Sequence, residues 1–117
     1  MNVEEYRHFC LGLKGSNEAT PFGEGTLVLK VLNKMFALFD IELFTSINLK
    51  CDPEKAIELR EKYEFVIPGY HMNKKHWNSI TNPVNVPEAL LKQLTIDSYD
   101  LVLAKMSKTE KTALDIF

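Results

Sequence analysis

The stretch from Pro68 to Asn78 is denser in reactive and charged side chains than any other part of the sequence. Its eleven residues include two histidines, two lysines, two aromatic rings and two side-chain amides. No Asp or Glu occurs from Phe65 to Pro87, although the chain has 16 acidic against 14 basic side chains and a formal net charge of −2. The stretch is therefore locally positive in a mildly acidic chain, which favours contact with an anion.

Metal binding is the first chemistry to weigh here. His71 and His76 are five residues apart, which on a helix would place them about 140° from each other around the axis. No carboxylate or thiol nearby offers a third ligand, whereas zinc sites use three or four protein ligands. The two cysteines, Cys10 and Cys51, lie far apart and outside any C-x-x-C pattern, so a zinc knuckle or a disulfide framework is not expected. We predict no metal and no cofactor.

Catalysis is the second possibility. A histidine beside a lysine can serve as a general base, but the sequence shows no serine or cysteine nucleophile with an orienting carboxylate and no glycine-rich phosphate loop. Ser79 near His76 is the only local pair, and such pairs are common by chance. We therefore predict that the protein is not an enzyme.

Contact with a nucleic acid is the third possibility. Lysine ammonium groups pair with phosphates, imidazoles and amides donate to phosphates or base edges, and aromatic rings stack on bases. The side chains that could act in these ways are Tyr70, His71, Asn73, Lys74, Lys75, His76, Trp77 and Asn78. Because the stretch has no arginine to grip guanine in a bidentate manner, the pattern indicates phosphate contact more than sequence readout.

A purely structural role is the alternative for each of these residues. Asn73 can cap a single helical turn formed by residues 74–77, and His71 can bond to a backbone carbonyl group. Trp77 can anchor the core, and for this residue we favour the structural role. Lys74 and Lys75 fit a solvated surface as well as they fit a ligand contact.

The elements around this stretch follow from local patterns. At 117 residues, with 45% hydrophobic and 26% charged side chains, the chain is predicted to form one globular domain over residues 1–117. Its longest nearly apolar run, from Met35 to Phe39, is too short to cross a membrane, and the polar, acidic start does not resemble a signal peptide. We expect a cytoplasmic protein without a membrane partner.

The first half of the chain predicts a helix followed by strands. Asn2 and Glu5 form a capping pair for a helix that should stop near Lys14-Gly15, and residues 16–25 read as a loop. Leu27, Leu29 and Val31 share one face of a strand that starts at Thr26. Two further strands are expected at 35–39 and 43–50, and their short connections favour an antiparallel meander.

The second half predicts further helices around the dense stretch. Asp52 caps a helix with Pro53 at its first position, which should run to about Tyr63. Short strands are expected at 65–67 and, as a last edge strand, at 78–81. A long helix opens at Pro87-Glu88, and Ser107 with Glu110 caps a final one. This order predicts an α+β fold with a single antiparallel sheet and N-terminal, middle and C-terminal helices packed on it.

The chain resembles the MmcQ/YjbR family of small bacterial proteins. The segments that carry the resemblance are Leu49-Lys50-Cys51-Asp52-Pro53-Glu54, Leu59-Arg60-Glu61, Pro68 to Asn78 and Ser98-Tyr99-Asp100-Leu101-Val102. The resemblance implies an α+β fold similar to type III secretion chaperones and frataxin-like proteins, and DNA binding as a predicted activity. The family positions that it carries over are Lys50, His71, Asn73, Lys74, His76 and Trp77.

We therefore predict a non-enzymatic nucleic-acid-binding module that uses the basic stretch at residues 70–78. The predicted contacts to DNA come from Lys50, His71, Asn73, Lys74, Lys75 and His76, whereas Trp77 and Asp52 are predicted structural anchors. The alternative is an adaptor or chaperone-like domain that binds a protein partner or a second copy of itself through an exposed sheet edge. That alternative is motivated by the strand at 35–39, which is apolar on both faces.

Overall fold

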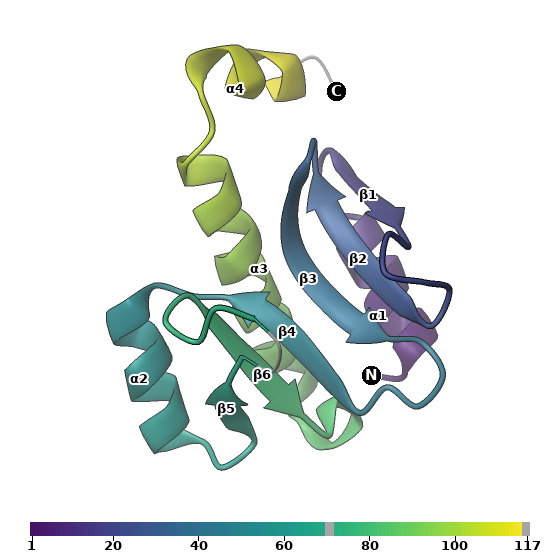
Figure 1. The fold of residues 1–117 in the computed structure, drawn as a ribbon, viewed down its shortest axis with the longest axis vertical. Coiled ribbons are helices and arrows are strands. Elements are labelled where there is room, and N and C mark those ends of the chain that lie inside the picture. Colours follow the sequence, from purple (N-terminus) through teal and green to yellow (C-terminus); the bar gives the residue numbers. More distant parts are fainter. Residues whose placement is uncertain (70–71, 116–117) are drawn as a thin grey trace.

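An antiparallel sheet of six strands forms the centre of the fold, and the first and third helices lie on one of its faces (Figure 1). The computed structural model describes residues 1–69 and 72–115. Within these residues the elements are α1 (Val3–Leu11), β1 (Ser16–Ala19), β2 (Thr26–Val31), β3 (Lys34–Asp40), β4 (Ser46–Lys50), α2 (Pro53–Lys62), β5 (Val66–Pro68), β6 (Trp77–Thr81), the 3-10 turn η1 (Pro83–Asn85), α3 (Glu88–Ala104) and α4 (Lys108–Asp115). The predicted α+β fold with one antiparallel sheet is confirmed.

The strand order is β1-β2-β3-β4-β6-β5, and every neighbouring pair is antiparallel. This order corrects two expectations. The strand predicted as a last edge strand is β6, which lies between β4 and β5. Residues 16–19, predicted as loop, form the edge strand β1. Strand β3 lies inside the sheet, between β2 and β4.

Alternate residues of the central strands build a core under the helices. Leu27 of β2 lies opposite Phe39 of β3, which lies opposite Ile47 of β4, and Ile47 lies opposite Ile80 of β6. These four side chains are at most 5% exposed. In the view of Figure 1, α1 and α3 lie behind this sheet, and no helix of the described residues covers the face toward the reader.

Buried polar contacts fix α3 on the sheet. Ser98 of α3 donates its hydroxyl proton to the carbonyl oxygen of Phe36 at 2.6 Å and accepts a hydrogen bond from the backbone N–H of Lys50 at 2.9 Å. The hydroxyl of Thr95 lies 2.8 Å from that of Tyr6 in α1. Both α3 side chains are fully buried, so each contact replaces water that the group loses on folding.

The predicted helix starts agree with the structure better than the predicted ends. Asn2 and Glu5 form a reciprocal capping box, and Asp52 accepts the backbone N–H of Lys55 at 3.4 Å. Ser107 and Glu110 cap α4 in the same reciprocal way. Helix α1 ends at Leu11, earlier than predicted, and its cap is Gly12. Strand β4 begins three residues later than expected, at Ser46.

Within residues 1–69 and 72–115, no helix combines the length and apolar character needed to span a bilayer.

Candidate nucleic-acid interface

The loop between β5 and β6 carries most of the predicted site and is anchored by a close contact at Gly69. A Cβ atom on Gly69 would lie 2.7 Å from Cβ of Trp77 and 2.8 Å from its carbonyl oxygen. The Gly69 N–H donates to that same carbonyl oxygen at 2.8 Å. Only glycine allows the two strands to approach this closely, because any other residue would place its side chain inside Trp77.

Asn73 shapes the loop from within. Its side-chain oxygen accepts the backbone N–H groups of Lys75 at 2.9 Å and His76 at 3.3 Å, which is the usual geometry of an Asx turn. The single helical turn predicted for residues 74–77 is therefore only partly right, since residues 74–76 form a turn and Trp77 begins β6. The oxygen of Asn73 is used within the chain, whereas prediction placed this residue among the DNA contacts.

Arg60 of α2 holds this loop against the helix. Its Nε donates to Oδ1 of Asn78 at 2.7 Å, and its Nη2 donates to the carbonyl oxygen of Lys74 and, at 3.4 Å, to that of Trp77. Asn78 completes the link by donating from Nδ2 to the carbonyl oxygen of Ala56 at 3.3 Å. Sequence reasoning missed Arg60, although an arginine on the helix preceding the loop was the available signal.

Asn78 and Trp77 are not free to meet a ligand as sequence reasoning had considered. Asn78 is 2% exposed with its amide fully engaged, and Trp77 is 7% exposed. A base cannot stack on a ring that is this deeply buried. The structure instead supports the favoured reading of Trp77 as an anchor, with Asp52 capping α2.

Lys50 lies beside Trp77 at the carboxyl end of β4. The two residues are cross-strand partners, and Nζ of Lys50 stands 6.0 Å from the centroid of the indole ring. Partial burial lowers the pKa of Lys50, and the nearby ammonium groups of Lys105 and Lys34 lower it further. Positive groups from β3 and the end of α3 therefore act on Lys50, although Lys34 also has Glu110 at 4.0 Å. An anion near Lys50 would relieve this repulsion.

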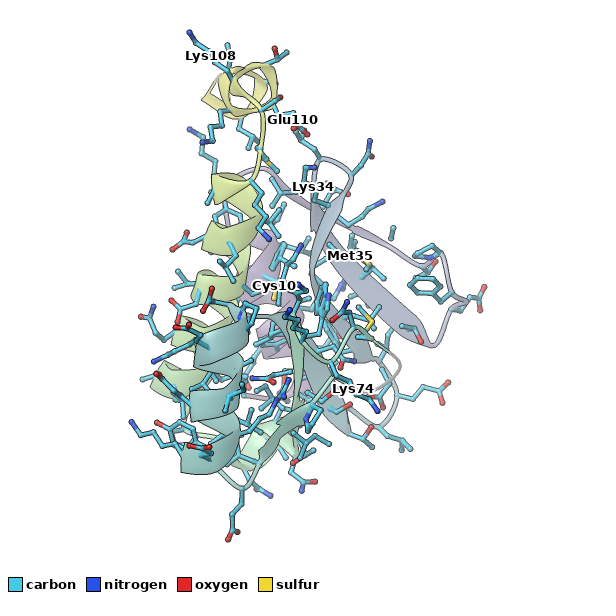
Figure 2. All side chains as sticks on the ribbon, turned by 60° about the vertical axis from the view of Figure 1, so that its left-hand side comes forward. Cys10, Lys34, Met35, Lys74, Lys108 and Glu110 are labelled. Carbon is cyan, nitrogen blue, oxygen red and sulfur yellow. The ribbon has the colours of Figure 1, made fainter. Side chains whose placement is uncertain are left out.

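Lys74 and Lys75 are exposed on the same loop. In the described part of the chain, neither lysine forms an ion pair with Asp97, Asp100 or Glu64. Figure 2 shows Lys74 on the loop and Lys34 farther along the molecule, next to Glu110. The two exposed ammonium groups extend the positive region beyond Lys50.

The sheet has a basic end and an acidic end. The register pairs Val31 with Lys34 at the β2–β3 turn and Lys50 with Trp77 at the start of β6. Lys34 lies away from the loop, next to Glu110 (Figure 2). We call the lysines on this side of the sheet the basic end: Lys34, Lys50, Lys74, Lys75 and Lys105. At the other end Thr26 pairs with Asp40, so the two loops that carry acidic residues 24 and 42 leave the sheet together.

The remaining predicted residues are placed as follows. His76 is half-buried, and its carbonyl oxygen accepts the Cys51 N–H at 2.7 Å. His71 and Tyr70 lie outside the described residues. Lys34 and Lys105 were missed by sequence reasoning, although the antiparallel meander already required the turn before Lys34 to lie at the same end of the sheet as Lys50. Among residues 1–69 and 72–115, no group of three or more His, Cys, Asp or Glu side chains is placed to hold a metal ion.

Comparisons with known proteins agree on the family. The YjbR family model matches residues 11–101. The chain is 40% identical over 92 residues to the uncharacterised protein YbdF of Escherichia coli O157:H7, covering 78% of this chain and 75% of that protein. It is 24% identical over 115 residues to the uncharacterised protein YjbR of Escherichia coli strain K12, covering 97% and 98%.

A solved structure supports the same assignment. The crystal structure of Deinococcus radiodurans protein DR2400, a DUF419 domain, superposes with a TM-score of 0.87 and 42% sequence identity. The match covers 97% of this chain and 88% of that one. On the strength of the family model and this structural match, the chain belongs to the YjbR family.

Proposed function

We propose that this protein binds nucleic acid through the phosphate backbone, using the basic end of its sheet. The observation that supports this most is the place of Lys50, which pairs with Trp77 at the end of the loop that carries the exposed Lys74 and Lys75, while the ammonium groups of Lys105 and Lys34 lower its pKa. Mutual repulsion among ammonium groups is a cost that bound phosphates would remove. Double-stranded DNA offers one negative charge per about 1.7 Å of helix axis, so it can neutralise several of these groups at once.

The hydrogen-bonded backbone at residues 74–76 favours binding as well. The backbone around Lys74 is held by Arg60 and by the Asx turn of Asn73, so little loop entropy would be lost on binding. The described part of this end presents lysines and no arginine fork free for guanine, because Arg60 is engaged with Asn78 and backbone carbonyls. Binding should therefore depend weakly on base sequence.

A salt titration tests this proposal. With a fluorescent duplex, neutralisation of about four phosphates gives a slope of log K against log salt near −3.6. Lys74→Glu/Lys75→Glu should weaken binding and flatten this slope. The matched control is Lys108→Glu/Lys111→Glu on α4, which makes the same charge change at exposed sites; Figure 2 shows Lys108 pointing away from Lys74.

Two outcomes of that titration would overturn the proposal. The first is no binding by the wild-type chain at tens of micromolar protein and low salt. The second is an equal loss of affinity in the loop variant and in the α4 control, because binding would then follow the net charge of the chain and not the basic end.

Protein contact is a second candidate, favoured by two exposed apolar side chains at the acidic end. Phe22 is 66% exposed and Leu43 is 79% exposed, and their loops are joined by a hydrogen bond from Ile41 N–H to the Gly25 carbonyl oxygen at 3.0 Å. The strand that first suggested an adaptor, β3, is internal and offers no edge. Sedimentation of wild type against Phe22→Ser/Leu43→Ser tests self-association; a wild type that stays monomeric at high concentration removes that form of the candidate.

A further inference from the structure

A pocket of about 370 Å³ lies between α2, α3 and the ends of β4 and β6. Most of its wall is apolar and comes from six residues: Leu49, Leu59, Ile80, Leu94, Leu101 and Ala104. Cys51 and Asn78 add polar atoms to the wall, and Asp52, Lys55, Asp97 and Asp100 are exposed at its mouth. Both the volume and the apolar wall with few polar groups are typical of small-molecule sites.

The pocket exists because α2 and α3 dock on different strands. Helix α2 packs on β5 and is tied to β6 through Asn78, whereas α3 packs on β3 and β4 and is tied to them through Ser98. Each helix is thus fixed by its own polar link to the sheet. The space between them does not depend on a ligand to keep it open.

Carboxylates outnumber ammonium groups among the lining residues, with Asp52, Asp97 and Asp100 against Lys50 and Lys55. Asp97 and Asp100 are three residues apart on α3, so their side chains lie on the same face of the helix. Lys55 is drawn toward Glu58, with 3.9 Å between Nζ and Oε2, and Lys50 is drawn toward the ring of Trp77. In the described part of the chain, neither aspartate forms an ion pair.

The pKa of the Cys51 thiol, which lines the pocket, is affected by the nearby carboxylates. Burial raises the pKa of Cys51, and the carboxylates of Asp52 and Asp97 raise it further, against smaller opposite effects of Lys55 and Arg60. A carboxylate-headed ligand would meet the same repulsion, whereas a cation would be attracted.

We propose that this pocket binds a small amphipathic amine, with its apolar body against Leu59 and Leu94 and its ammonium group between Asp97 and Asp100. An ammonium group has three N–H donors and no acceptor, so it can satisfy two carboxylates at once. The site is separate from the phosphate contacts proposed above, although Lys50 lines both regions.

Three eight-carbon probes that differ in the charge of their polar head group test whether the pocket prefers a cation. Octylammonium, octanol and octanoate are titrated below their aggregation limits into the full chain, with binding followed by backbone NMR shifts. We expect octylammonium to bind up to about fivefold more tightly than octanol, since a partly exposed ion pair contributes up to about 1 kcal/mol. Octanoate should bind most weakly.

Variants distinguish binding of the ammonium group at Asp97 and Asp100 from binding of the alkyl chain at the apolar wall. Asp97→Asn/Asp100→Asn should abolish the preference for octylammonium while octanol still binds, and Glu24→Gln/Glu42→Gln, with the same charge change at the acidic end, should leave it intact. Ala104→Trp, at an exposed helical position, should block all three probes. Failure of every probe to bind the wild type, or a preference that survives loss of both aspartates, overturns the proposal.

Alkylation of Cys51 supplies an independent readout. The chain has two cysteines, and Cys10 is fully buried while Cys51 is partly exposed. Reaction of the folded protein with iodoacetamide should therefore occur at Cys51, disappear in Cys51→Ser and slow severalfold when octylammonium is bound. An unchanged rate at saturating octylammonium would place the amine elsewhere and overturn the proposal.

Discussion

Replacing Arg60 with methionine should destabilise the fold through a residue that was not among the predicted site residues. The change leaves Oδ1 of Asn78 without its donor at a site that is 2% exposed. An unsatisfied buried acceptor costs about 1–3 kcal/mol. Loss of the two hydrogen bonds to the carbonyl oxygens of Lys74 and Trp77 adds roughly 1 kcal/mol to this cost, because water can donate to these oxygens in place of Arg60. We expect Arg60→Met to lower the free energy of unfolding by about 2–4 kcal/mol.

Urea unfolding followed by the fluorescence of Trp77, the single tryptophan, measures this loss beside the loop itself. Arg60→Lys keeps the charge but lacks the planar fork, so it should recover less than half of the stability. A double-mutant cycle with Asn78→Leu isolates the pair, and the double variant should be more stable than the sum of single effects predicts by about 1 kcal/mol or more. The reasoning fails if Arg60→Met costs under about 0.5 kcal/mol, or if lysine restores full stability.

Three further perturbations follow from the same region. Gly69→Ala should cost about 2 kcal/mol or more and lower the unfolding temperature, since its new Cβ would overlap Trp77; an unchanged melting curve contradicts the close contact. The pKa of Lys50 is lower in the folded chain than in the unfolded chain, so the folded state binds fewer protons between the two pKa values and stability rises with pH there. The urea midpoint of Lys50→Met relative to wild type should therefore fall as pH rises toward 10.5, and a constant difference would count against the lysine cluster. Glu110→Gln removes the charge that lies 4.0 Å from Lys34 while keeping an oxygen for the helix cap, so it should tighten duplex binding about twofold at low salt; weaker binding would exclude Lys34 from the contact surface.

Local patterns in the sequence predicted the features that depend on a few neighbouring residues. The capping pairs at Asn2, Asp52 and Ser107 were correct because an N-cap bonds to amides only two or three residues away. The alternation from Thr26 to Val31 was correct because a strand with one buried face must repeat every two residues. Such signals need no knowledge of the rest of the chain.

Features that depend on distant segments were the ones that the sequence did not supply. Strand β6 was predicted as an edge strand because no local sequence pattern indicates that β5 pairs with its outer side. Likewise, Asn78 appeared to be a free amide, since its partners Arg60 and Ala56 lie about twenty residues earlier on a helix. The sequence did not indicate that Lys105 acts on the pKa of Lys50, because this depends on the length and angle of α3, which no local pattern sets.

Ser98 links strands β3 and β4 where their backbones do not pair directly. The register of β3 and β4 stops at the pair Ala37 and Leu49, and beyond that pair one hydroxyl group connects the Phe36 carbonyl oxygen to the Lys50 N–H. The strands are held together at this point by a helix and not by each other. Hydrogen exchange at the Lys50 amide therefore reports whether α3 is docked, even though this residue ends a strand and would otherwise be expected to fray.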